Sequence, residues 1–236
     1  MMFPVNVKSL STPRFIENGA SNNNYGNFNL ANHVGDEPSA VLANRQLLIN
    51  HYNLPAEPKW LDQCHSNICV NVGSPYSLKA DASISQMPGV VCAVLTADCL
   101  PVFLCKKDGS AVGVIHAGWR GLLTGVIEAS IEALDPNKGE ILAHLGPGIS
   151  QNAFEVDVEV REAFVDSHAG YESAFIRCNN KYMFDLYAVA RTALVAHGVE
   201  SITGGDRCTY LEKNQYFSYR RDGEVSGRMA HLIWMT

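Results

Sequence analysis

Two apolar runs joined by a short polar turn constrain the middle of the chain more than any other feature. Residues 101–106 (PVFLCK) and 111–116 (AVGVIH) are rich in β-branched and apolar side chains, and KKDGS lies between them. These features predict an antiparallel hairpin. A turn centred near Lys107 and Asp108 pairs Cys99 with His116, which brings their Cβ atoms to about 4.5–5.5 Å. Pro101 lies in the first strand and has no N–H for the ladder, so the register can slip there.

A cysteine opposite a histidine suits two kinds of chemistry, and the residues alone leave both open. The pair can hold a metal ion, and His65, which lies just before an expected strand, offers a third ligand. Three protein ligands with a vacant fourth position are typical of catalytic zinc. Alternatively, Cys99 is a nucleophile and His116 its base. His65 is also read as an ordinary loop histidine bonded to backbone.

The remaining patterns predict one mixed α/β (α+β) domain over residues 1–236, with sheets flanked by helices and an irregular segment at residues 1–24. Apolar β-branched runs indicate further strands at 66–72, 90–97, 141–147 and 228–235. Helical periodicity indicates helices at 40–52 (with Ser39 as N-cap), 122–134, 158–170 and 185–198.

Charge and cysteine content exclude several classes of protein. The net charge is -6 and the longest basic run is Arg220-Arg221, which argues against a nucleic-acid partner. The N-terminus lacks the pattern of a signal peptide, and no apolar run approaches the roughly 18 residues of a membrane span. The seven cysteines, an odd number, fit free thiols in a reducing compartment. We therefore expect a cytoplasmic protein without a membrane partner.

Three motifs in order, TADCLPV, HAGWRGL and LGPGI, closely resemble the YfiH-like family of purine nucleoside phosphorylases, an older label for which is copper polyphenol oxidase or laccase. The resemblance covers nearly the whole chain from about residue 25. It implies a zinc site formed by His65, Cys99 and His116, with purine nucleosides (adenosine, inosine, guanosine and 5'-methylthioadenosine) and phosphate as substrates, and adenosine deaminase activity. The first motif of this chain, residues 62–66 (DQCHS), keeps only Gln and His of the family's NQVHG pattern.

Further roles are hypotheses built on that resemblance. Zinc lowers the pKa of bound water to about 7, which would supply hydroxide for deamination. Arg45 is our first choice for binding phosphate, with Arg120 or Arg220 assisting. Gln63 is expected to bond a purine edge. Asp98 is read equally as a proton acceptor or support for Cys99, and as a turn residue that caps its own backbone.

Three other functions compete with the phosphorylase. The first is a cysteine hydrolase or deamidase that uses Cys99 and His116, in line with a resemblance to toxin deamidase folds. The second is a copper-dependent polyphenol oxidase, which the sequence disfavours because its eight histidines include no H-x-H run. The third is a regulatory protein with a structural zinc. The oligomeric state stays open.

Overall fold

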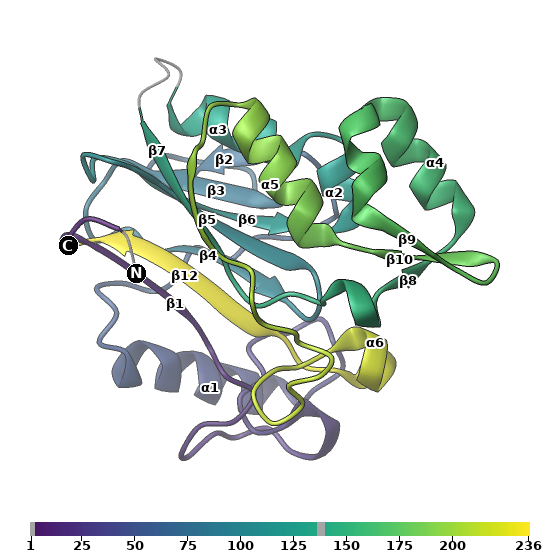
Figure 1. Ribbon diagram of the computed structural model, residues 1–236. Helices are drawn as coiled ribbons and strands as arrows, with labels where there is room; N and C mark the ends of the chain where they lie inside the picture. The colour runs from purple at the N-terminus through teal and green to yellow at the C-terminus, as the bar shows by residue number, and fades with distance from the viewer. Residues whose placement is uncertain (1–2, 136–139) are drawn as a thin grey trace.

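A six-stranded mixed sheet forms the centre of the computed structural model, which describes residues 3–135 and 140–236 (Figure 1). The outer pairs β11–β7 and β2–β3 are parallel, and the inner pairs are antiparallel. In sheet order the strands are β11 (Ser201–Gly204), β7 (Ile141–Leu145), β5 (Leu100–Lys106), β6 (Val112–Ala117), β3 (Ala82–Ser85) and β2 (Cys69–Asn71).

A three-stranded antiparallel sheet covers one face of the central sheet. Its strands are β1 (Val7–Ser11), β12 (Met229–Met235) and β4 (Cys92–Thr96). Side chains alternate along β12: Ile233 packs toward Phe103 of the central sheet, whereas Leu232 and Trp234 pack toward Leu48 of α1 (Pro38–His51). Because side chains alternate and each face of β12 is covered by other elements, the strand has apolar residues on both faces.

Helices cover the other face of the central sheet (Figure 1). They are α2 (Trp119–Leu123), α3 (Val126–Leu134) and α5 (Leu186–Ala196), whereas α4 (Val158–Ser167) lies to the side and packs against α2. A small third sheet, β8 (Glu155–Val156), β10 (Lys181–Phe184) and β9 (Phe175–Cys178), extends beside α4. The short segments are α6 (Tyr219–Asp222), η1 (Asn23–Tyr25), η2 (Gln151–Ala153), η3 (Ala169–Ala174) and η4 (Gly223–Val225). Within the described residues, no helix has both the length and the apolarity to cross a membrane.

The predicted hairpin is confirmed as β5–β6, but its predicted register is wrong by two positions. Pro101, rather than Cys99, pairs with His116. The turn is centred between Asp108 and Gly109, because Gly109 adopts a left-handed φ of 71° and the Asp108 carboxylate accepts the amide of Ser110. Cys99 therefore lies just before β5.

The mixed α/β fold is confirmed, and several predicted boundaries are wrong. The expected helix at 122–134 is broken into α2 and α3 at Gly125, whose φ of 87° ends the first helix. Helix α1 begins at Pro38 without a Ser39 cap, because proline suits a first helical turn. The segment 66–72 yields only β2, and residues 1–24 include β1.

Candidate functional site

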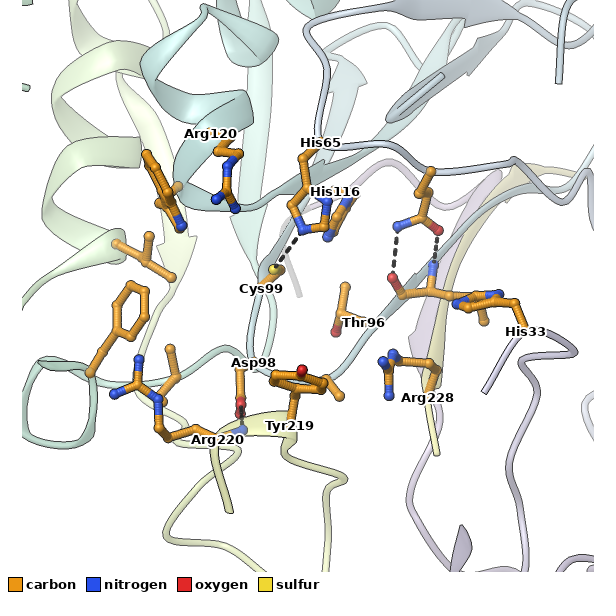
Figure 2. A pocket seen from close by; sticks show the side chains of 17 residues that line it. His33, His65, Thr96, Asp98, Cys99, His116, Arg120, Tyr219, Arg220 and Arg228 are labelled. Atoms are coloured by element: carbon orange, nitrogen blue, oxygen red, sulfur yellow. Dashed lines mark hydrogen bonds between the residues drawn. The ribbon is translucent and has the colours of Figure 1, made fainter. Parts of the chain in front are cut away.

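Three side chains from separate segments converge near the ends of β4 and β6 (Figure 2). His116 lies near the end of β6, Cys99 lies in the turn between β4 and β5, and His65 lies in the loop before β2. One potential ligand atom from each lies within 4.8 Å of the others, and the Sγ of Cys99 is 3.9 Å from Nε2 of His65. The expected triad is therefore assembled, although Cys99 and His116 are not a cross-strand pair.

The spacing of these donors fits a metal ion. Bonds of about 2.0–2.3 Å in tetrahedral geometry separate ligand atoms by roughly 3.4–3.8 Å. The three atoms, which lie within 4.8 Å of one another, would move closer by up to about 1.4 Å to bind one ion. Gly118 keeps the space between two of the ligands open. A Cβ at this position would lie 3.1 Å from the Sγ of Cys99 and 2.9 Å from Cδ2 of His65. Within residues 3–135 and 140–236, this is the single group of three or more His, Cys, Asp and Glu side chains placed to share a metal.

Asp81, which the sequence reasoning missed, holds this centre from behind. The residue is fully buried, and its carboxylate accepts a 2.8 Å hydrogen bond from Nδ1 of His116. Burial alone would raise the pKa of Asp81, but hydrogen bonds from His116 and Ser66 lower it, so the carboxylate is ionised. The run of small residues from Ala80 to Ser85 gives little sign of this role; an aspartate directly before a buried strand is the one available signal.

The two groups that face each other across the site have strongly shifted pKa values. Burial would raise the pKa of Cys99, but the charge of His116 and hydrogen bonds to His116 and His65 lower it to about 6. Burial would lower the pKa of His116, but the charge of Cys99 and the bond to Asp81 raise it to about 9. The site therefore favours a thiolate beside an imidazolium. A divalent cation would bind the thiolate directly and would take the place of one proton on the imidazolium.

Asp98 fastens the Cys99 turn to a distant segment. It has a φ of 92°, which is unusual for a residue with a side chain. One carboxylate oxygen accepts the hydroxyl of Thr209 at 2.6 Å, and the other accepts the backbone N–H of Arg220 at 2.7 Å. Both oxygens are thus bonded to donors from segments far along the chain.

Gln63 is also bonded to backbone. Its Nε2 donates to the carbonyl of Leu95 at 2.8 Å, and its Oε1 accepts the N–H of Leu95 at 2.7 Å. The side chain therefore continues the hydrogen bonding of β4 and holds the loop that carries His65. This contact differs from the purine contact that the sequence predicted.

The arginines expected to bind phosphate lie in different places. The guanidinium of Arg120 is exposed over the ring of Trp119. That of Arg220 donates to the carbonyl of Glu155. Arg45 donates to the carbonyl of Leu30 and lies over Trp60, and it is not among the described residues that line the pocket.

A pocket of about 430 Å³ opens beside the three potential ligands. Arg228 and His33, for which no role was predicted, line it at one end, and Arg120 and Arg220 line it at the other (Figure 2). The described lining residues include one carboxylate, that of Asp98, so the pocket is electropositive within an acidic chain. The lining consists of His33, Gln63, His65, Leu95, Thr96, Ala97, Asp98, Cys99, His116, Trp119, Arg120, Ile149, Phe154, Leu186, Tyr219, Arg220 and Arg228.

Comparison with known proteins gives full-length matches. The sequence model of a family described as "Multi-copper polyphenol oxidoreductase laccase" matches residues 11–236. Purine nucleoside phosphorylase YfiH of Escherichia coli is 48% identical over 234 residues, which cover 98% of this chain and 95% of that protein. A purine nucleoside phosphorylase of Pseudomonas aeruginosa is 44% identical with the same coverage.

Solved structures share the fold. A crystal structure of a Neisseria meningitidis protein aligns with a TM-score of 0.91 and 44% identity, covering all of this chain (100%) and 96% of that one. A hypothetical protein YfiH of Bacillus licheniformis aligns with a TM-score of 0.87 and 27% identity, covering 98% and 93% of the two chains.

Proposed function

The chain belongs to the YfiH-like family, whose sequence model carries the description multi-copper polyphenol oxidoreductase laccase, and on that premise we propose that it is a zinc-dependent purine nucleoside phosphorylase. The observation that carries the proposal is the convergence of His65, Cys99 and His116 on one side of an electropositive pocket. The names of the E. coli and P. aeruginosa relatives support the same activity. The reaction takes a purine nucleoside and phosphate to the free purine and ribose 1-phosphate.

The dimensions and walls of the pocket suit a nucleoside. A volume of about 430 Å³ lies in the range of about 300–1,000 Å³ typical of small-molecule sites. The rings of Trp119, Phe154 and Tyr219 line one part of the pocket, and a flat purine gains most from contact with such rings. We place the base there. Adenosine, inosine, guanosine and 5'-methylthioadenosine are the proposed substrates.

We place the phosphate at the end that carries His33 and Arg228, with Arg45 nearby. Burial lowers the pKa of His33, and repulsion from the positive charges of Arg228 and Arg45 lowers it further. An anion would relieve this repulsion, which is how clustered arginines bind phosphate. This arrangement keeps Arg45, the first choice from the sequence, as a contributor to the electrostatic field of the site. Arg120 and Arg220, at the other end, are left to contact the nucleoside.

The metal supplies a Lewis acid beside the departing purine when it is bound. The chain's own residues do the rest. Asp81 holds the ring of His116, and Asp98 and Gln63 hold the Cys99 turn and the His65 loop.

Zinc fits the donor set better than multicopper oxidation does. Copper oxidases use several metal centres, whereas the described residues provide a single group of this kind. We also propose adenosine deaminase activity in the same pocket, in which water replaces the purine amino group to give inosine and ammonia. The proposed location is the cytoplasm.

The test incubates purified protein with each nucleoside, with and without phosphate, and separates the products by chromatography. Metal content is measured on the same sample. Cys99→Ala and His65→Ala should lose both bound zinc and phosphorolysis. Cys178→Ala, which changes a half-buried cysteine on β9, and His51→Ala, at the exposed end of α1, should retain both. Full turnover by Cys99→Ala would reject the proposal.

A second candidate is a metal-free cysteine hydrolase, because Asp81, His116 and Cys99 also form a carboxylate–imidazole–thiol series. In that case, hydrolytic activity would survive removal of the metal by a chelator. Iodoacetamide would then abolish it by alkylating Cys99. Phosphorolysis that disappears with the metal and returns with added zinc excludes this candidate.

A further inference from the structure

One carboxylate reaches both segments that supply the histidine ligands. Oδ1 of Asp81 accepts Nδ1 of His116 at 2.8 Å and the N–H of His65 at 3.0 Å. Oδ2 accepts four more donors: the N–H of Ser66 at 2.6 Å, its hydroxyl at 2.7 Å, the N–H of Cys64 at 3.2 Å and the thiol of Cys64 at 3.7 Å. The three consecutive amides thus point at a single fully buried anion.

The contact with His116 fixes which ring nitrogen faces the site. Strand β3 pairs with β6 so that Asp81 lies opposite His116, and the N–H of His116 donates to the carbonyl of Asp81 at 2.7 Å. An ionised carboxylate only accepts hydrogen bonds, so Nδ1 carries the proton. Nε2 is therefore the nitrogen left for a metal. A carboxylate behind a ligating histidine orients its ring and increases its basicity.

The contact with the loop holds His65 in an unfavourable backbone conformation. His65 has a φ of 60°, in the left-handed region, where a residue with a side chain pays an energetic cost. The bonds from residues 64–66 to Asp81 offset that cost. The hydroxyl of Ser66 adds a donor that the glycine of the family's NQVHG pattern does not have.

We propose that Asp81 is the positioning residue that assembles the metal site, and that Ser66 strengthens its hold on the His65 loop in this chain. The proposal rests on the proposed metal binding. Asp81 touches no metal: it acts through the ring of His116 and the backbone of His65. A carboxylate with a merely structural role would affect folding and leave the metal affinity and the ligand geometry unchanged.

The test measures metal affinity by competition with a chromophoric chelator. It also records the thiolate–cobalt absorption of the Co²⁺ form, which reports the geometry at Cys99, and urea unfolding of the metal-free protein. The variants are Asp81→Asn, Ser66→Ala and Ser66→Gly. Asp62→Asn is the matched control because Asp62 is exposed in the same loop.

We expect Asp81→Asn to bind zinc about 10- to 100-fold more weakly, with an altered cobalt spectrum. Ser66→Ala and Ser66→Gly should weaken binding less, because the backbone N–H at residue 66 remains. Asp62→Asn should match the wild type.

Two results would overturn the inference. The first is wild-type zinc affinity and a wild-type cobalt spectrum in Asp81→Asn, whatever its stability. The second, which applies if Asp81→Asn does not fold, is wild-type zinc affinity and a wild-type cobalt spectrum in Ser66→Ala. A wild-type protein that binds neither zinc nor cobalt would overturn the proposed function together with this inference, and that outcome is distinct because every variant would then match the wild type.

Discussion

Gly118 offers the sharpest test of the metal centre, because its substitution changes nothing except the space between two ligands. The backbone at Gly118 has φ -72° and ψ 162°, which alanine adopts without strain. The added Cβ would lie 3.1 Å from the Sγ of Cys99 and 2.9 Å from Cδ2 of His65. Ordinary contacts between such atoms are about 3.5–4.0 Å, so the ligands must move apart by roughly 0.5 Å.

That displacement exceeds what a metal site tolerates. Ligand distances in metal sites hold within about 0.2 Å, so at least one bond must lengthen or break in Gly118→Ala. We expect zinc affinity to fall about 10- to 100-fold, which corresponds to about 1.4–2.7 kcal/mol, as for other changes that displace ligands. Phosphorolysis at limiting zinc should fall in parallel, and excess zinc should restore part of it.

Chelator competition measures the affinity, and urea unfolding of the metal-free protein measures stability separately. Gly73→Ala is the matched control, because its Cβ would meet only the side chains of Asn71 and Met87, which can move. Wild-type zinc affinity in Gly118→Ala would refute the reasoning, because it would mean that Cys99 and His65 do not share a metal across this gap.

Three further predictions concern pH, reactivity and phosphate. Burial lowers the pKa of His231 to about 3 from 6.5, so its contribution to stability is complete above about pH 6.5 and is lost as the pH falls toward 3. In urea unfolding from pH 7 to 4, the free energy of unfolding should fall more in the wild type than in His231→Gln, by up to about 1.4 kcal/mol per pH unit. Equal slopes for the two proteins would contradict this. In the metal-free protein, iodoacetamide at pH 7 should label Cys99, whose pKa is lowered to about 6, before Cys105, whose pKa burial raises to about 12. Zinc should protect Cys99 from this labelling. If mass spectrometry finds Cys99 labelled equally with and without zinc, that result would count against ligation. Arg228→Ala should raise the KM for phosphate about tenfold or more and change the KM for the nucleoside less. Arg177→Ala, on the exposed face of β9, should leave both KM values unchanged. A larger change in the KM for the nucleoside than in that for phosphate would place phosphate elsewhere.

The sequence by itself determined the main elements and the identity of the potential ligands. Runs of β-branched residues predicted the strands of the central hairpin, because such runs pack well only on pleated surfaces. The motifs around Cys99 and His116, and the histidine kept at position 65, pointed to the residues that the fold brings together. These signals are local, so they can be read along the chain.

Only the tertiary structure decided how those residues are held. The hairpin register depended on which residue took the left-handed position in the turn, and Gly109 moved it by two places. Asp81 meets His116 only because β3 lies beside β6, a pairing between segments 35 residues apart that no local pattern encodes. Arg228 enters the pocket for the same reason, since β12 lies next to β4. Long-range strand pairing decides such neighbours, because it depends on how whole apolar faces are buried together rather than on the residues at the site.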